Sequence, residues 1–143
     1  MADQQQLDLL KQGKEAWHQW RQAHPNVEPD ISGAHLPKTF LGGLDLNKAK
    51  LDRADLSGSH LVGVNLSNAS LREANVSDAD LSDANLRQAN FSHADLTGAI
   101  FDGSVLTGAN FDGAVLDGAI VDGTDLREVL LNGSLQSDSE STY

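Results

Sequence analysis

A period of five residues runs through the chain from residue 31 onward and limits its fold more than any other feature. Every fifth position from Ile31 to Leu131, 21 positions in all, is aliphatic or Phe. A second series stands two residues before each of these, and Ala fills 13 of its 21 places. The other three positions of each repeat hold mostly Asp, Asn, Ser, Thr and Gly. Each repeat therefore has one large and one small residue suited to a core and three residues suited to solvent.

Neither a long helix nor a regular strand can bury such a pattern. In an α-helix five residues advance by ~500°, so successive large residues step by ~140° around the axis and reach every face. In a strand, an odd period turns the side chain to the opposite face at each repeat. The period fits short extended segments, each followed by a turn of constant hand, so that the fifth residue returns to the interior. Gly fills 11 of the 21 places two residues after the large apolar one, which suits the positive φ of a type II turn.

Tandem units such as ADLSG at 54–58, ANLRQ at 84–88, ADLTG at 94–98 and ANFDG at 109–113 resemble the A(D/N)LXX units of the pentapeptide-repeat family. The resemblance implies an all-β solenoid, a right-handed quadrilateral β-helix with four pentapeptides per coil and about five coils over residues 30–133. The order W-x-x-W-R and then PDISGAHL, within residues 17–36, also resembles the junction between cap and repeats in cyanobacterial members. Members of the family serve different roles, so the resemblance indicates the fold far more than the function.

Four repeats per coil place residues that are 20 apart on top of one another. The large residues then form four ladders along the axis, one of which holds Leu51, Leu71, Phe91, Phe111 and Leu131. Because the residues two positions earlier are small, the large ones can meet at the axis, and we expect a filled interior rather than a pore. The expected core ladder includes Leu71, Leu81, Leu86, Phe91, Leu96, Phe101 and Phe111.

The ends of a solenoid expose unpaired backbone and apolar side chains, so they need caps. Residues 3–24 have the apolar spacing of one amphipathic helix, with Leu10, Trp17 and Trp20 on its apolar face and Pro25 ending it. We expect residues 1–29 to form an N-terminal cap and lead-in, and a partner-binding helix is the alternative. We expect residues 134–143 to be a polar C-terminal tail. The last coil then either lies under this tail or docks on a second copy to make a homodimer.

The sequence contains no pattern of catalytic or metal-binding residues. There is no Cys, and none of the five His residues is placed to converge with another. The Ser and Asp side chains are surrounded in the repeat pattern by other Ser and Asp residues, with no His at a matching position. No set of nucleophile, base and orienting group therefore forms. We therefore expect no enzyme activity, no metal and no cofactor. Since no apolar stretch is long enough for a signal or a membrane span, we expect a soluble, cytoplasmic protein.

The formal net charge is −11 and the pI is near 4.5, which argues against nucleic acid or an anionic membrane as a direct partner. The acid collects on two adjacent sides of the predicted coil, with formal charges of −4 and −3. The −4 side also carries two isoleucines one coil apart, in positions usually held by Asp or Asn. We predict a protein-binding surface there, formed by Asp80, Asp83, Ile100, Asp102, Ile120 and Asp122.

These features favour a non-catalytic scaffold that presents rigid acidic faces to an unidentified partner protein, one form of which is a regulatory binder like family members in cyanobacterial cell differentiation. The alternative is a DNA-mimicking modulator of DNA gyrase or topoisomerase, because acidic members of the family imitate duplex DNA against type II topoisomerases. Duplex DNA carries one charge per ~1.7 Å, so a solenoid ~24 Å long would need about 14 charges. The two acidic sides together hold −7, half that density.

Overall fold

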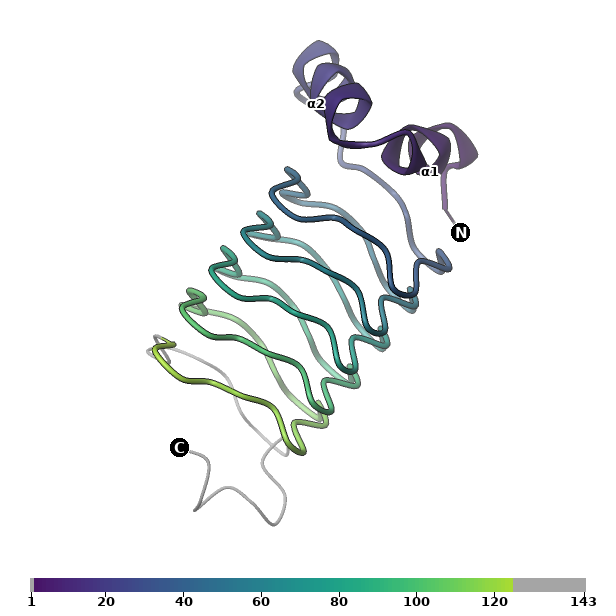
Figure 1. Cartoon of the computed structure of the whole chain (residues 1–143). Helices are drawn as coiled ribbons and strands as arrows, with labels where there is room; N and C mark the ends of the chain where they lie inside the picture. Colours follow the sequence, from purple (N-terminus) through teal and green to yellow (C-terminus); the bar gives the residue numbers. More distant parts are fainter. Residues whose placement is uncertain (1, 125–143) are drawn as a thin grey trace.

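The computed structural model describes residues 2–124 as two helices followed by a stack of coils (Figure 1). Helix α1 spans Gln4–Lys11 and helix α2 spans Lys14–Ala23. Both helices lie at the end of the stack where the first coil begins. The expected total of about five coils and the expected boundary at residue 133 both involve residues 125–143, which lie outside the described residues.

Isolated parallel bridges hold the coils together, and each bridge joins a residue to the one 20 positions later. Fifteen such bridges run from Asp30↔Lys50 to Ile100↔Ile120. Each is made by two backbone hydrogen bonds. At one of them, the N–H of Leu81 donates to the carbonyl of Ile100 at 2.7 Å, and the N–H of Ile100 donates to the carbonyl of Ala79 at 2.9 Å. A coil therefore contains four five-residue repeats and has four sides, as the resemblance to the pentapeptide-repeat family implies.

A tight turn follows each large apolar residue. In most turns the N–H of the small residue donates to the carbonyl of the large one, as Ala84 donates to Leu81 at 3.2 Å. The third turn residue has a φ between 52° and 74°, the left-handed conformation that a type II turn requires. This confirms the expectation that the Gly-rich position, two residues after the large apolar one, has a positive φ. At Gly103 the lack of a side chain matters twice, because φ is 70° and a Cβ would collide with the Asp83 carboxylate of the preceding coil.

The interior is a filled core, as expected. All seven residues of the predicted ladder, Leu71, Leu81, Leu86, Phe91, Leu96, Phe101 and Phe111, are at most 2% exposed. The Phe91 ring stacks on that of Phe111 with centroids 5.1 Å apart, and it meets the ring of Phe101 edge-on at 6.4 Å. The Ala residues at the small position are buried with them. Leu131, predicted to extend one ladder, lies outside the described residues.

The prediction of one continuous cap helix over residues 3–24 is wrong, because the chain forms two helices that are separated at Gln12 and Gly13. Gly13 has a φ of 112°, which a helix cannot contain, and Gly is the weakest helix former after Pro. The break lets each helix bury its own side chain on the first coils. Leu10 of α1 is 3% exposed and Trp17 of α2 is fully buried, whereas Trp20 is only half-buried and packs on Trp17 with ring centroids 5.4 Å apart.

The cap also pairs backbone groups that the first coil would leave open. The N–H of Asp3 donates to the carbonyl of Asp30 at 2.7 Å, and the N–H of Asp30 donates to Oε1 of Gln6 at 2.6 Å. The indole Nε1–H of Trp17 donates to the carbonyl of Asp45 at 2.8 Å. Residues 2–29 thus close the edge of the stack with hydrogen bonds as well as apolar contacts, as the cap interpretation requires.

Replacing Phe91 with Ala tests the stacked core. The ring is fully buried between two other rings, so we expect a loss of about 3–5 kcal/mol in the free energy of unfolding, measured by urea denaturation. Phe40→Ala is the matched control, because Phe40 is 80% exposed and its loss should leave the stability nearly unchanged. Equal effects of the two substitutions would contradict this core.

Candidate protein-interaction surface

One side of the solenoid carries a straight row of residues that lie outside the core. Phe40, His60, Asp80, Ile100 and Ile120 bridge one to the next along the axis. At ~4.8 Å per coil, the row is about 19 Å long. We call this side the row face; it comprises the row and the turn residues beside it, at positions 42, 43, 62, 63, 82, 83, 102, 103, 122 and 123.

All six residues of the predicted binding surface lie on the row face. Asp80, Ile100 and Ile120 belong to the row itself, and Asp83, Asp102 and Asp122 stand exposed in successive turns beside it. Two backbone hydrogen bonds hold these turns together, from the N–H of Asp83 to the carbonyl of Asp102 at 2.8 Å and from the N–H of Gly103 to the carbonyl of Asp122 at 3.1 Å. Ile120 is 43% exposed, while Ile100 and Asp80 are half-buried.

The predicted surface left out the first half of the same face. Phe40 is 80% exposed, and its ring stacks on that of His60 with centroids 4.5 Å apart and planes 5° from parallel. Val62, in the turn beside them, is 42% exposed. The signal was present in the sequence, because positions 40, 60, 80, 100 and 120 share the 20-residue spacing of the row.

The two halves of the row face differ in charge. The first half holds Phe40, His60, Val62 and glycines at positions 42, 43 and 63, with no carboxylate. The turn at Gly42 packs closely on the next coil, since a Cβ there would approach the Val62 carbonyl to 3.0 Å. The second half holds all four Asp residues of the face together with the two isoleucines. The row face thus has one aromatic and aliphatic end and one acidic and aliphatic end.

Asx turns distinguish the row face from the other three sides. In such a turn, the Asp or Asn side chain at the bridge position accepts a hydrogen bond from the backbone N–H two residues later. Among the described residues each other side has three of these turns, whereas the row face has one, at Asp80. There Oδ1 of Asp80 accepts from the N–H of Ser82 at 3.0 Å and from its hydroxyl at 2.5 Å. Asp80 is therefore committed in part to its own turn.

The adjacent acidic side shows how such a turn holds a carboxylate. Oδ1 of Asp55 accepts from the hydroxyl of Ser57 at 2.6 Å and from its backbone N–H at 3.0 Å. His35 Nδ1 lies 3.2 Å from the other oxygen of Asp55. The Ser57 hydroxyl first, and then its N–H, hold the pKa of Asp55 below its ordinary value, because both stabilise the charged form.

Ser57→Ala should raise the pKa of Asp55 towards its ordinary value, as followed by NMR titration of the carboxyl carbon. Since the folded pKa is lowered, the stabilisation is present above the unfolded pKa, about 3.9, and is lost as the pH falls through the folded pKa. Ser77→Ala is the control, because Ser77 makes the same hydroxyl contact to Asn75 one coil further on. An Asp55 pKa that moves equally in both variants would contradict the assignment.

Within residues 2–124, no three His, Cys, Asp or Glu side chains are grouped so that they could hold a metal ion. No helix in this part of the chain is long and apolar enough to cross a membrane. The residues expected to form an end-to-end homodimer contact, in the last coil, lie outside the described residues, so the homodimer stays a prediction.

Two family models described as pentapeptide repeats match the chain, one over residues 30–61 and 49–88 and the other over residues 71–115 and 86–130. Together with the four-sided coil, these matches show that the chain belongs to the pentapeptide-repeat proteins, which form right-handed quadrilateral β-helices. No enzyme family is indicated, and proteins of this family are typically non-catalytic. No protein of curated function matches the chain significantly.

Several solved structures are similar to this chain. A pentapeptide repeat protein from the Arabidopsis thaliana thylakoid lumen has 31% identity and a TM-score of 0.67, over 69% of this chain and 69% of that one. Rfr23 from the cyanobacterium Cyanothece 51142 has 31% identity and a TM-score of 0.59, over 80% of this chain and 90% of its own. HetL from the cyanobacterium Nostoc has 32% identity and a TM-score of 0.52, over 76% of this chain and 57% of its own. The relatives thus include plant and cyanobacterial proteins.

Proposed function

We propose that this protein is a non-catalytic scaffold that binds a partner protein on the row face. The observation that supports this most is the placement of its exposed apolar side chains. Of the five large hydrophobic residues that are exposed in the described chain, Phe40, Val62 and Ile120 lie on this one side. Single exposed apolar residues are normal on any protein, but their collection on one face is typical of interaction sites.

The backbone beneath the row face favours binding without reorganisation. Each row residue from His60 to Ile100 is bridged to a coil on both sides, and its position is set by hydrogen bonds of 2.7–3.0 Å. A surface that is already ordered loses little conformational entropy when a partner docks, so more of the contact energy remains as affinity. The partner best suited to the face is apolar at one end and basic at the other, because the Asp residues lie only in the second half.

A relative supports a regulatory form of this scaffold. HetL, 32% identical over the matched region, is described as a pentapeptide repeat protein involved in the regulation of heterocyst differentiation. This chain spans 57% of HetL, so a role of that kind is a proposal here. It is compatible with a scaffold that acts by holding another protein rather than by chemistry.

The alternative, a DNA-mimicking modulator of gyrase or topoisomerase, is less well supported. Its basis is the acidic charge, and the two acidic sides carry −7, about half of what a duplex of the same length would present. The first half of the row face adds an exposed aromatic ring and no carboxylate. A supercoiling assay with this protein tests the alternative directly, and inhibition or protection of gyrase would favour it over the scaffold.

The main test is affinity capture from the native host with the tagged protein and the double substitution Ile100→Asp and Ile120→Asp. We expect captured partner protein to fall by about tenfold or more, because two apolar contacts in the acidic half are lost together. The matched control is Asn90→Asp with Asn110→Asp, a bridged pair on the opposite side that adds the same charge. Retention of every partner by the Ile100 and Ile120 variant would rule out this half of the face.

Phe40→Ala tests the other half. Because the ring is 80% exposed and its main contact is the stack on His60, we expect the melting temperature to stay nearly constant while binding of the captured partner weakens. The measurement is the dissociation constant of the purified pair by titration calorimetry. Unchanged affinity in Phe40→Ala would confine the binding surface to the acidic half.

A further inference from the structure

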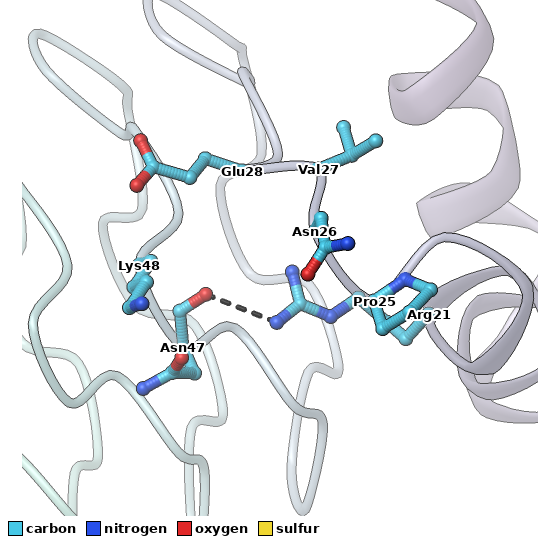
Figure 2. Close-up of a pocket in the computed structure, with 7 residues that line it drawn as sticks. All are labelled: Arg21, Pro25, Asn26, Val27, Glu28, Asn47 and Lys48. Carbon is cyan, nitrogen blue, oxygen red and sulfur yellow. Dashed lines mark hydrogen bonds between the residues drawn. The ribbon is translucent and has the colours of Figure 1, made fainter.

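A small polar pocket lies where the cap meets the first coils (Figure 2). It is lined by residues from three segments: Arg21 from α2, residues 25–28 from the connection that follows, and Asn47 with Lys48 from a turn of the solenoid. Its volume is about 140 Å³, which is room for more than a single water molecule. The row face is not involved, so the pocket is a separate site.

The guanidinium of Arg21 reaches into this pocket with part of its hydrogen-bonding capacity unused. Its side chain is only 13% exposed. Nη2 donates to the carbonyl of Asn47 at 3.1 Å, as the dashed line in Figure 2 shows. Nη1 is buried and has no hydrogen-bond partner among the described residues. A buried charged donor without a partner is costly, so an acceptor at this position would be strongly favoured.

The nearby carboxylates leave Nη1 open. Oδ1 of Asp45 is 3.7 Å from Nη2 of Arg21, beyond hydrogen-bond distance, and it already accepts from the N–H of Asn47 at 3.0 Å. Glu28 lines the pocket, but Figure 2 shows its carboxylate turned away from the guanidinium. Neither acid occupies the acceptor position beside Nη1.

Lys48 supplies a second cation at the same pocket. It is the third residue of its turn, with a φ of 63°, a place where Gly would be unstrained. Lys48 forms no ion pair within residues 2–124. The pocket thus carries two cations, Arg21 with its side chain 13% exposed and Lys48 on the surface, beside the carboxylate of Glu28.

We propose that this pocket binds a small oxyanion, through a carboxylate or phosphate group that accepts from Nη1 of Arg21 and pairs with the ammonium of Lys48. Charge-assisted hydrogen bonds from a guanidinium to such a group are among the strongest that proteins make. Because Arg21 also bonds to Asn47, a bound anion would strengthen the link between α2 and the first coils.

The test is a titration of the full chain, labelled with ¹⁵N, with sodium phosphate and separately with sodium acetate, at a fixed ionic strength set with sodium chloride. We expect saturable shifts of the amide signals of Arg21, Asn26, Asn47 and Lys48. Stronger binding of phosphate would indicate that the natural ligand presents a phosphate group. Stronger binding of acetate would indicate that it presents a carboxylate. The absence of a saturable shift with either salt up to about 50 mM, a concentration well above the dissociation constant of a specific site, would overturn the proposal and leave water as the occupant.

Lys48→Gly provides a variant that keeps the fold, since Gly suits the positive φ of this turn. We expect it to weaken anion binding roughly threefold or more. Lys38→Gly is the matched control, because Lys38 also has a positive φ, 52°, and lies outside the pocket. Equal affinities of the two variants would overturn the role of Lys48 and with it the site.

Arg21→Gln removes the main donor and should abolish the saturable shifts. The indole N–H signal of Trp17, which is hydrogen-bonded to the Asp45 carbonyl, reports whether the cap stays docked in this variant. Anion binding that persists in Arg21→Gln with the cap docked would also overturn the proposal.

Discussion

The parallel pairing of each residue with the one 20 positions later is the constraint on which the other features depend. One bridge per repeat, made of two hydrogen bonds, fixes both the height of a coil and the side that each residue occupies. An insertion or deletion of one residue would move every later large side chain out of the core. The five-residue period holds over so many repeats only because every turn contains the same number of residues. The positive φ of the third turn residue allows this same short turn in each repeat.

The repeated part of the fold could be predicted from the sequence because each repeat meets the same physical conditions. Leu81, Phe91 and Phe101 are buried for the reason that every fifth residue is buried, so the position decides the outcome. The cap lies outside this rule. Apolar spacing predicted one helix through Gly13, since the spacing says nothing of where a chain must bend to bring Leu10 and Trp17 onto the first coils. That bend depends on tertiary contacts, which override local propensity.

The candidate surfaces were predictable to different degrees. The acidic half of the row face could be predicted by assigning each charged residue to a side of the coil. The first half could be predicted from the 20-residue spacing, which places Phe40 in the same row as Ile120. The pocket has no such signal. Arg21 and Lys48 are far apart in the sequence and belong to parts with different geometry, so only the docking of α2 brings them together.

The residue at the bridge position, which pairs with the next coil, has one of two roles in this protein, and a single side chain cannot fill both. An Asp or Asn there turns its side chain back onto the N–H two residues later, as Asp55 and Asn65 do, and stabilises the turn by about 1 kcal/mol per hydrogen bond. Phe40, Ile100 and Ile120 cannot make that bond, and each forgoes its stabilisation while exposing apolar surface. On three sides the first role prevails. The row face departs from it at four of its five bridge positions, more than any other side among the described residues. This concentration of lost turn bonds on one side agrees with the proposal that the row face is a surface for contact with a partner.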